Sequence, residues 1–242
     1  MPQRAEMIVV GNEVLTGKVR DENGPYLAVE LRALGVVLER LTVIPDSLDI
    51  IARTVREASS RADFVVTSGG VGPTLDDLTF EGVARAFDRP LRRFPEMEAI
   101  LRSYFGATTT ESHLVMADLP EGSELVFNDG LMFPVVKTGN VFVFPGSPAI
   151  FRKKWRALRE RFRGAPFTLR RVFVTLEEGL LSPHLDRLQE LVPEVELGSY
   201  PVFDDPTYAV QVTLESADPG VAKRALDLLL AALDPATVTK VE

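Results

Sequence analysis

The sequence contains no cysteine, two histidines and one tryptophan. The absence of cysteine excludes disulfides, thiolate nucleophiles, zinc–thiolate sites and iron–sulfur clusters. The two histidines, His113 and His184, lie far apart in the chain and lack metal-ligand spacing, so we interpret both as structural. Any metal is therefore expected to be a hard cation held by oxygen ligands.

Long apolar runs and an excess of positive charge are also absent. No stretch of 18 apolar residues occurs, which excludes a transmembrane helix, and the run Met7–Val10 is too short for a signal peptide. We therefore expect a cytoplasmic protein that does not bind membranes. The 27 basic residues are outnumbered by 35 acidic residues, a net charge of −8, which argues against nucleic-acid binding.

The sequence does contain enough apolar residues for a sizeable core. Its 242 residues are 45% hydrophobic and 26% charged, which is typical of a soluble globular protein of one to two domains. Residues 1–165 carry 21 basic and 22 acidic residues, whereas residues 166–242 carry 6 and 13. This change in charge coincides with Gly164-Ala165-Pro166. We predict two domains, 1–165 and 166–242, of which the nearly neutral first one suits an anionic small molecule better.

Apolar strands alternate with amphipathic helices in the first 165 residues. Strands are predicted at Met7–Val10, Val36–Val43 and Asp63–Thr67, each followed by a helix, which indicates an α/β fold with a parallel sheet covered on both faces. Further predicted elements are helices at 95–105, 111–117 and 148–162 and a hairpin of 133–137 with 140–144. The tail alternates strand, helix, strand, strand and helix, which predicts a small α+β domain.

A glycine-rich segment at the end of the third predicted strand is the strongest candidate site. Thr67 and Ser68 end the strand, and a loop with Gly69, Gly70 and Gly72 follows. In open α/β sheets ligands bind at this edge, and glycines allow a phosphate to reach backbone N–H groups and a helix N-terminus. The loop is neither a Walker loop nor a G-x-G-x-x-G fingerprint. Pro73, Thr74 and Thr79 complete the predicted ligand-binding segment.

Asp76 and Asp77 lie directly after this loop. Two carboxylates should repel a phosphate, unless a divalent cation bridges carboxylate and phosphate oxygens. We therefore predict that both are catalytic, metal-binding residues. The alternative is that one caps the next helix and the other interacts with its dipole.

Three more loops follow strand ends. Gly11-Asn12-Glu13 offers Glu13 as a metal ligand or general base, and Asn23 as a ligand contact. Alternatively Glu13 is merely solvated and Asp21 or Asn23 caps a helix. Gly146 and Ser147 offer N–H groups at a helix start, with a simple proline-rich turn as the alternative. Asp46, in the loop after the second predicted strand, is a further candidate ligand contact, although we favour its alternative role as a cap of the next helix.

Other features indicate structural roles. The basic residues between Arg152 and Arg163 are interpreted as a solvated helix face, and Trp155 as a core residue. Ser68 and Ser147 lack a histidine partner, so a hydrolase triad is not expected.

In this order the motifs resemble a known family. Gly11-Asn12-Glu13-Val14-Leu15-Thr16-Gly17, Asp46, Gly69-Gly70-Val71-Gly72-Pro73-Thr74-Leu75-Asp76-Asp77-Leu78-Thr79 and Pro145-Gly146-Ser147-Pro148 resemble the CinA-like branch of the molybdopterin-binding domain superfamily. Phe133-Pro134-Val135-Val136 and Leu197-Gly198-Ser199-Tyr200-Pro201 resemble the corresponding domain of FAD synthases. Asn12 and Ser147 depart from the residues that many CinA-like members carry, which leaves the substrate open.

The resemblance implies a three-layer α/β/α domain that forms homo-oligomers. It also implies metal-dependent hydrolysis of ADP-ribose-type pyrophosphates or of FAD, while other members bind or adenylylate molybdopterin. Asp76, Asp77 and Glu13 would be the metal or catalytic residues, Gly69–Thr74 would hold the phosphates, and Gly146 and Ser147 would close the site. Full-length CinA proteins carry a C-terminal deamidase domain, for which residues 1–242 leave no room, so deamidation is not expected.

The leading hypothesis is therefore a nucleotide pyrophosphatase that uses Mg, Mn, Co or Ni. The alternative is a non-catalytic module that binds a nucleotide or a pterin phosphate.

Overall fold

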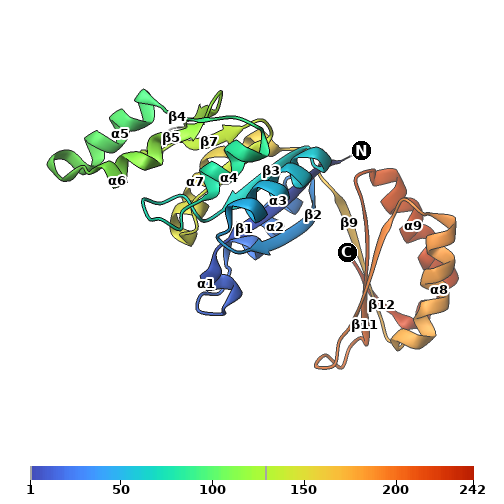
Figure 1. Ribbon diagram of the computed structural model, residues 1–242. Coiled ribbons are helices and arrows are strands. Elements are labelled where there is room, and N and C mark those ends of the chain that lie inside the picture. Colours follow the sequence, from blue (N-terminus) through green and yellow to red (C-terminus); the bar gives the residue numbers. More distant parts are fainter. Residues whose placement is uncertain (1, 129) are drawn as a thin grey trace. The chain divides into compact units, whose positions relative to one another are not determined.

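The computed structural model describes residues 2–128 and 130–242 (Figure 1). The chain divides into two compact units, Pro2–Gly164 and Ala165–Glu242, which are described separately. Within the described residues, none of the helices is long and apolar enough to cross a membrane.

The first unit is built on a six-stranded sheet with the order β2-β1-β3-β8-β7-β6. The strands are β1 (Gln3–Val10), β2 (Val36–Ile44), β3 (Phe64–Ser68), β6 (Glu124–Val126), β7 (Val135–Thr138) and β8 (Val141–Phe144). The four strands β2, β1, β3 and β8 are parallel, whereas β7 and β6 join as antiparallel partners. The predicted parallel sheet is therefore confirmed, with two antiparallel strands at one side.

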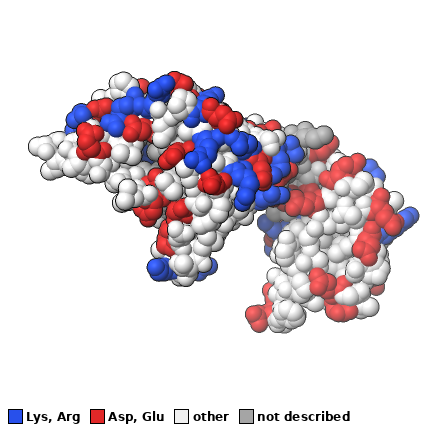
Figure 2. All heavy atoms as spheres, in the orientation of Figure 1, with Lys and Arg blue, Asp and Glu red and all other residues white. Residues whose placement is uncertain are grey.

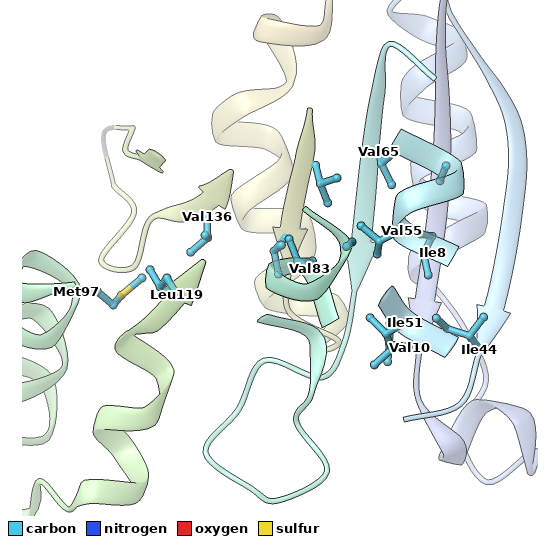
Figure 3. Close-up of a cluster of buried hydrophobic side chains, with 14 of the residues drawn as sticks. Ile8, Val10, Ile44, Ile51, Val55, Val65, Val83, Met97, Leu119 and Val136 are labelled. Atoms are coloured by element: carbon cyan, nitrogen blue, oxygen red, sulfur yellow. The ribbon is translucent and has the colours of Figure 1, made fainter. Parts of the chain in front are cut away.

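Helices cover both faces of this sheet, as the alternating pattern predicted. Helices α3 (Leu48–Arg61) and α4 (Thr79–Ala86) pack on one face, where Ile51, Val55 and Val83 meet Ile8 and Val65 (Figure 3). On the other face, α2 (Asn23–Ala33) and α7 (Pro148–Leu158) bury Leu27, Phe151 and Trp155. Every residue of β3 and β8 is buried, as expected for strands with helices on both faces.

A helical excursion between α4 and β6 lies to one side of the sheet (green in Figure 1). It consists of β4 (Leu91–Arg93), α5 (Pro95–Phe105), η1 (Gly106–Thr108), α6 (Glu111–Leu114), η2 (Val115–Ala117) and β5 (Asp118–Pro120). His113 caps α6 together with Thr110 and stacks on Phe105 with ring centroids 3.8 Å apart, which fits a structural role.

The structure corrects several sequence predictions. The predicted loop that begins with Gly11-Asn12-Glu13 contains a short helix, α1 (Asn12–Leu15). Its start is fixed by Asp46, whose Oδ2 accepts a 2.7 Å hydrogen bond from Asn12 N, a contact between residues far apart in sequence. Strands β4, β5 and β6 have three residues each and were not predicted. The predicted helix at 111–117 divides into α6 and η2, and the one at 148–162 into α7 and η3 (Arg159–Phe162).

The second unit is a four-stranded antiparallel sheet with two helices against it. Its elements are β9 (Thr168–Val174), α8 (Glu178–Leu191), β10 (Glu196–Pro201), β11 (Val210–Ser216), α9 (Pro219–Ala232), η4 (Pro235–Thr237) and β12 (Val238–Val241). The strand order is β10-β11-β9-β12. Burial alternates along β11, so one sheet face packs on α8 and α9 and the predicted α+β character is confirmed. Strand β12 was not predicted.

Charge is distributed differently in the two units. On the face of the first unit seen in Figure 2, basic and acidic side chains are interspersed, whereas acidic residues predominate on the second. The candidate site described below lies in the unit whose charges nearly balance.

Candidate functional site

The parallel strands bring the four predicted loops to one edge of the sheet. Glu13 follows β1, Asp46 follows β2, Gly69 follows β3 and Gly146 follows β8. These strands run in the same direction, so their carboxyl ends lie together, where ligands bind in open α/β sheets. The loops after β3 and β8 touch, because a Cβ on Gly146 would lie 3.3 Å from the Cα of Gly69.

The glycine loop after β3 requires glycine at two positions. Gly69 has φ +103° and Gly70 has φ +63°, conformations that side chains rarely adopt. A Cβ on Gly69 would also collide with the carbonyl oxygen of Val10, and a Cβ on Gly70 would collide with Thr79 Oγ1. The loop thus lies directly against the end of β1 and the start of α4.

Buried Thr79 fixes the loop from the helix side. Its Oγ1 donates a 2.8 Å hydrogen bond to the carbonyl of Gly69, and its backbone N donates a 2.9 Å bond to the carbonyl of Gly70. Both loop carbonyls therefore face the helix, which leaves backbone N–H groups for the other side.

Three consecutive backbone N–H groups are available in this loop. Those of Gly70, Val71 and Gly72 find no acceptor within the described part of the chain, whereas Gly69 N donates to Phe144 O over 3.1 Å. A row of free N–H groups at a turn is an anion-binding arrangement. Gly69 belongs to the predicted phosphate-holding segment Gly69–Thr74, but its N–H is therefore not one of the free donors.

The aspartate pair does not cap helix α4. The residue at the N-cap is Leu78, and no side chain caps the helix by a hydrogen bond. Asp77 instead accepts on Oδ2 from Thr74 N at 2.9 Å and from Thr74 Oγ1 at 2.5 Å. Hydrogen bonding from the Thr74 side chain, and then from its own backbone N–H, lowers the pKa of exposed Asp76. The capping alternative is therefore wrong for this pair.

Asn23 connects two of the loops from beneath. Its Nδ2 donates 2.8 Å hydrogen bonds to Ser68 Oγ and to the carbonyl of Gly146. Asn23 is 3% exposed, and its Oδ1 is buried without a partner among the described residues. Thr67, one residue before Ser68, is fully buried, and its Oγ1 has no hydrogen-bond partner among the described residues. It therefore lies deeper than the predicted ligand-binding residues of the glycine loop.

Glu13 lies apart from the aspartate pair. Its carboxylate folds back over Gly11, where an added Cβ would be 2.5 Å from Oε1. It lines a small cavity of about 80 Å³ with Asn23, Ser68 and Gly146. Asp21 lines the same cavity and accepts from Asn23 N and Gly24 N at the start of α2, although Glu22 occupies the N-cap position of that helix.

The remaining predicted residues lie at the rim. Pro73 and Thr74 are exposed in the glycine loop, and Gly146 and Ser147 are exposed at the start of α7. Ser147 is the N-cap residue of α7, but its side chain makes no capping hydrogen bond. Asp46 orients α1 through Asn12 instead of capping α3.

The carboxylates form a pair and not a cluster of three. Among residues 2–128 and 130–242 no group of three His, Asp or Glu side chains is positioned to hold a metal. Mg²⁺ is commonly held by one or two carboxylates together with substrate phosphates and water. Asp76 and Asp77, next to the free N–H groups, fit that kind of ligand set, while Glu13 would have to act separately.

Sequence reasoning missed Lys154 and the pocket that it lines. Lys154 is 8% exposed, and its Nζ donates to the carbonyls of Phe133 at 2.8 Å and Pro134 at 2.6 Å. Burial lowers the pKa of Lys154 to about 8. The expectation of a solvated helix face is therefore wrong here. The spacing from Phe151 to Leu158, which places residue 154 on the apolar face of α7, was the available signal.

Two protein-family models match the chain in succession. One described as "Probable molybdopterin binding domain" matches residues 6–163, and one described as "FAD synthase, middle domain" matches residues 166–242.

Individual relatives agree with these matches. A protein of Archaeoglobus fulgidus is 37% identical over 223 residues, which are 91% of this chain and 93% of the relative. A "Probable FAD synthase" of Caenorhabditis elegans is 29% identical over 89% of this chain and 47% of its own length. A "CinA-like protein" of Frankia casuarinae is 38% identical over 60% of this chain and 36% of its own length.

A solved structure shares the architecture of the first unit. The protein CinA "with unknown function" from Thermoplasma acidophilum is 31% identical, with a TM-score of 0.62 over 67% of this chain and 100% of that chain. The chain spans less than half the length of the FAD synthase and CinA-like relatives named above. By sequence and fold, this chain belongs to the molybdopterin-binding domain family, and its first domain is followed by a segment that matches the FAD synthase middle-domain model.

Proposed function

We propose that this chain is a divalent-metal-dependent hydrolase of a nucleotide pyrophosphate of the ADP-ribose or FAD type. One observation carries the proposal: three free backbone N–H groups, of Gly70, Val71 and Gly72, lie in the same loop as Asp76 and Asp77. The N–H groups suit phosphate oxygens, and the carboxylates suit a cation that accompanies them.

The residues of the loop have distinct roles in this proposal. The N–H groups hold the pyrophosphate and stabilise negative charge that develops on its oxygens. Thr74 holds Asp77 in place through two hydrogen bonds, so that Asp77 and Asp76 can bind Mg, Mn, Co or Ni. A divalent cation bound there would polarise the phosphate and lower the pKa of an attacking water.

Glu13 is assigned the role of general base and not of metal ligand. It lines a small cavity with Ser68 and Gly146, and neither aspartate lines that cavity. Asn23 holds this end together through Ser68 and Gly146 and supplies an unpaired Oδ1 as an acceptor.

A binding module without catalysis is the second candidate. It is favoured by the lack of a three-carboxylate cluster among the described residues, since a phosphate cradle alone needs no metal. In this case the ligand would be a pterin phosphate or a nucleotide, consistent with the family description.

Turnover measurements distinguish the two candidates. ADP-ribose, FAD, NAD and ADP are each incubated with the chain and Mg, Mn, Co or Ni, and release of AMP or phosphate is measured. Metal-dependent AMP release is expected. If no pair gives turnover and one compound still raises the melting temperature, the binding module is correct and the hydrolase proposal fails.

A further inference from the structure

An apolar pocket of about 290 Å³ lies beside the glycine loop. It is separate from the small cavity at Glu13, and apart from Val71 its lining residues take no part in the proposed phosphate chemistry. Val71, which lies between Gly70 and Gly72, forms part of its wall. Pro145 and Ile150, from the loop after β8 and the start of α7, form another part. A phosphate on the glycine loop would therefore lie next to the pocket mouth.

The lining is rich in flat and flexible apolar side chains, namely Phe80, Met97, Tyr104, Phe105, Met116 and Phe133. Tyr104 meets Phe105 and Phe133 edge-to-face, with centroid distances of 4.9 and 5.2 Å. Aromatic faces and edges pack well on a planar ring, and methionine adapts to its outline. The volume is at the lower limit of about 300–1,000 Å³ for ligand pockets, which suits one fused ring system and not a whole nucleotide.

Lys154 adds one polar group to this apolar wall. Its Nζ uses two of its three donors on the carbonyls of Phe133 and Pro134. No carboxylate within the described chain lies within ion-pair distance of it. The remaining donor requires an acceptor, and a buried donor without one is costly. A ring carbonyl supplies such an acceptor, whereas adenine has no carbonyl and offers only ring nitrogens.

We infer that this pocket binds a fused heteroaromatic ring that carries a carbonyl, with Lys154 donating to that carbonyl while the phosphates occupy the glycine loop. The inference deepens the proposed function and rests on it for the identity of the ligand as a phosphorylated ring compound. Flavin-type and pterin-type rings share this chemistry, so the experiment tests both. Adenosine serves as the comparison because its ring has no carbonyl.

The test uses ring compounds that carry no phosphate. Riboflavin, neopterin and adenosine are titrated into the full chain without metal, and the dissociation constants are measured by fluorescence and calorimetry. Riboflavin or neopterin is expected to bind at least tenfold more tightly than adenosine. If neither binds, or if adenosine binds as well as both, the inference is overturned.

Two pairs of variants locate the binding. Ile150→Trp fills the pocket mouth from a side chain that is 48% exposed, so it should fold, and we expect at least a tenfold loss of affinity. Val29→Trp, on α2 and 70% exposed, is the matched control and should bind as the wild type does. Lys154→Met should weaken binding about tenfold, whereas Lys153→Met, at an exposed neighbour, should not. Unchanged affinity in Ile150→Trp would place the ring elsewhere.

These outcomes separate the inference from the proposed hydrolysis. Ring binding needs neither metal nor the aspartates, so it should persist in Asp77→Asn. Ring binding without turnover refutes the hydrolase alone. Turnover of FAD or ADP-ribose that Ile150→Trp leaves unchanged, with no ring binding, refutes the pocket assignment alone.

Discussion

The hydroxyl of Thr79 donates a 2.8 Å hydrogen bond to the carbonyl oxygen of Gly69, and both groups are buried at the start of helix α4. This contact joins the first glycine of the loop to the helix ten residues later. It turns the loop carbonyls toward α4, so the N–H groups of Gly70 to Gly72 remain available to a ligand. The Thr79 hydroxyl is therefore one of the groups that set the shape of the proposed phosphate site.

Replacing Thr79 tests this dependence. Thr79→Val keeps the side-chain shape but leaves the Gly69 carbonyl without its donor, which should lower the free energy of unfolding by about 1–3 kcal/mol. We expect nucleotide binding to weaken as well, because the loop loses its anchor. Denaturant unfolding and ligand titration measure both effects. Thr79→Ser retains the hydroxyl and should bind like the wild type; equal binding by Thr79→Val would show that the hydroxyl does not shape the site.

Two glycine substitutions compare steric contact with backbone strain. Gly69→Ala introduces a Cβ that collides with the Val10 carbonyl at a φ of +103°, and should cost roughly 2–5 kcal/mol of unfolding free energy. Gly17 has φ +72° with nothing within 4 Å of an added Cβ, so Gly17→Ala should cost only about 1–2 kcal/mol. Thermal and denaturant unfolding rank the two variants. Similar costs for both would mean that the loop moves away from β1 easily.

Much of the first domain could be predicted from local sequence. The uninterrupted apolar residues of β3 and the spacing of Ile51 and Val55 on α3 indicate buried strands covered by helices, and the structure has them. Elements without such periodicity were missed. Helix α1 has four residues and is oriented by Asp46 from another loop, a contact that no local pattern encodes. Strands of three residues likewise depend on their partners more than on their own sequence.

The candidate site shows the same division. That the four loops share one sheet edge follows from parallel strands, and so could be predicted. That Glu13 lines a cavity without Asp77 could not be predicted. The direction of a side chain in a loop depends on contacts such as the hydrogen bond from Thr74 N to Asp77. Lys154 was assigned to solvent because its neighbours are basic, although its position relative to Phe151 and Leu158 places it in the core.

Asp77 provides the direct test of metal-dependent hydrolysis. Asp77→Asn keeps an acceptor for Thr74 but removes the charge, so we expect turnover to fall at least a hundredfold while the melting temperature changes little. Asp88→Asn is the control, because Asp88 is exposed and asparagine also adopts a φ of +54°. The substitution removes one surface ion pair, which is worth about 0–1 kcal/mol. Metal-dependent AMP release is measured for both. Unchanged release by Asp77→Asn would remove this carboxylate from the reaction.

Lys154 should make stability depend on pH above neutrality. Burial lowers the pKa of this lysine to about 8 in the folded chain, against an ordinary value of 10.5. Between these pH values the unfolded state binds more protons than the folded state, so the free energy of unfolding should rise with pH, by roughly 3 kcal/mol at most. Below pH 8 both states hold the proton and the full cost of burying the charge is present.

Other groups titrate in this window, so the difference between wild type and Lys154→Met isolates the contribution of Lys154. Urea unfolding at steps from pH 7 to 10.5 should show this difference growing in favour of the wild type, while Lys153→Met, which removes an exposed ammonium, should follow the wild type. Parallel pH profiles for wild type and Lys154→Met would show that burial does not lower the pKa of Lys154.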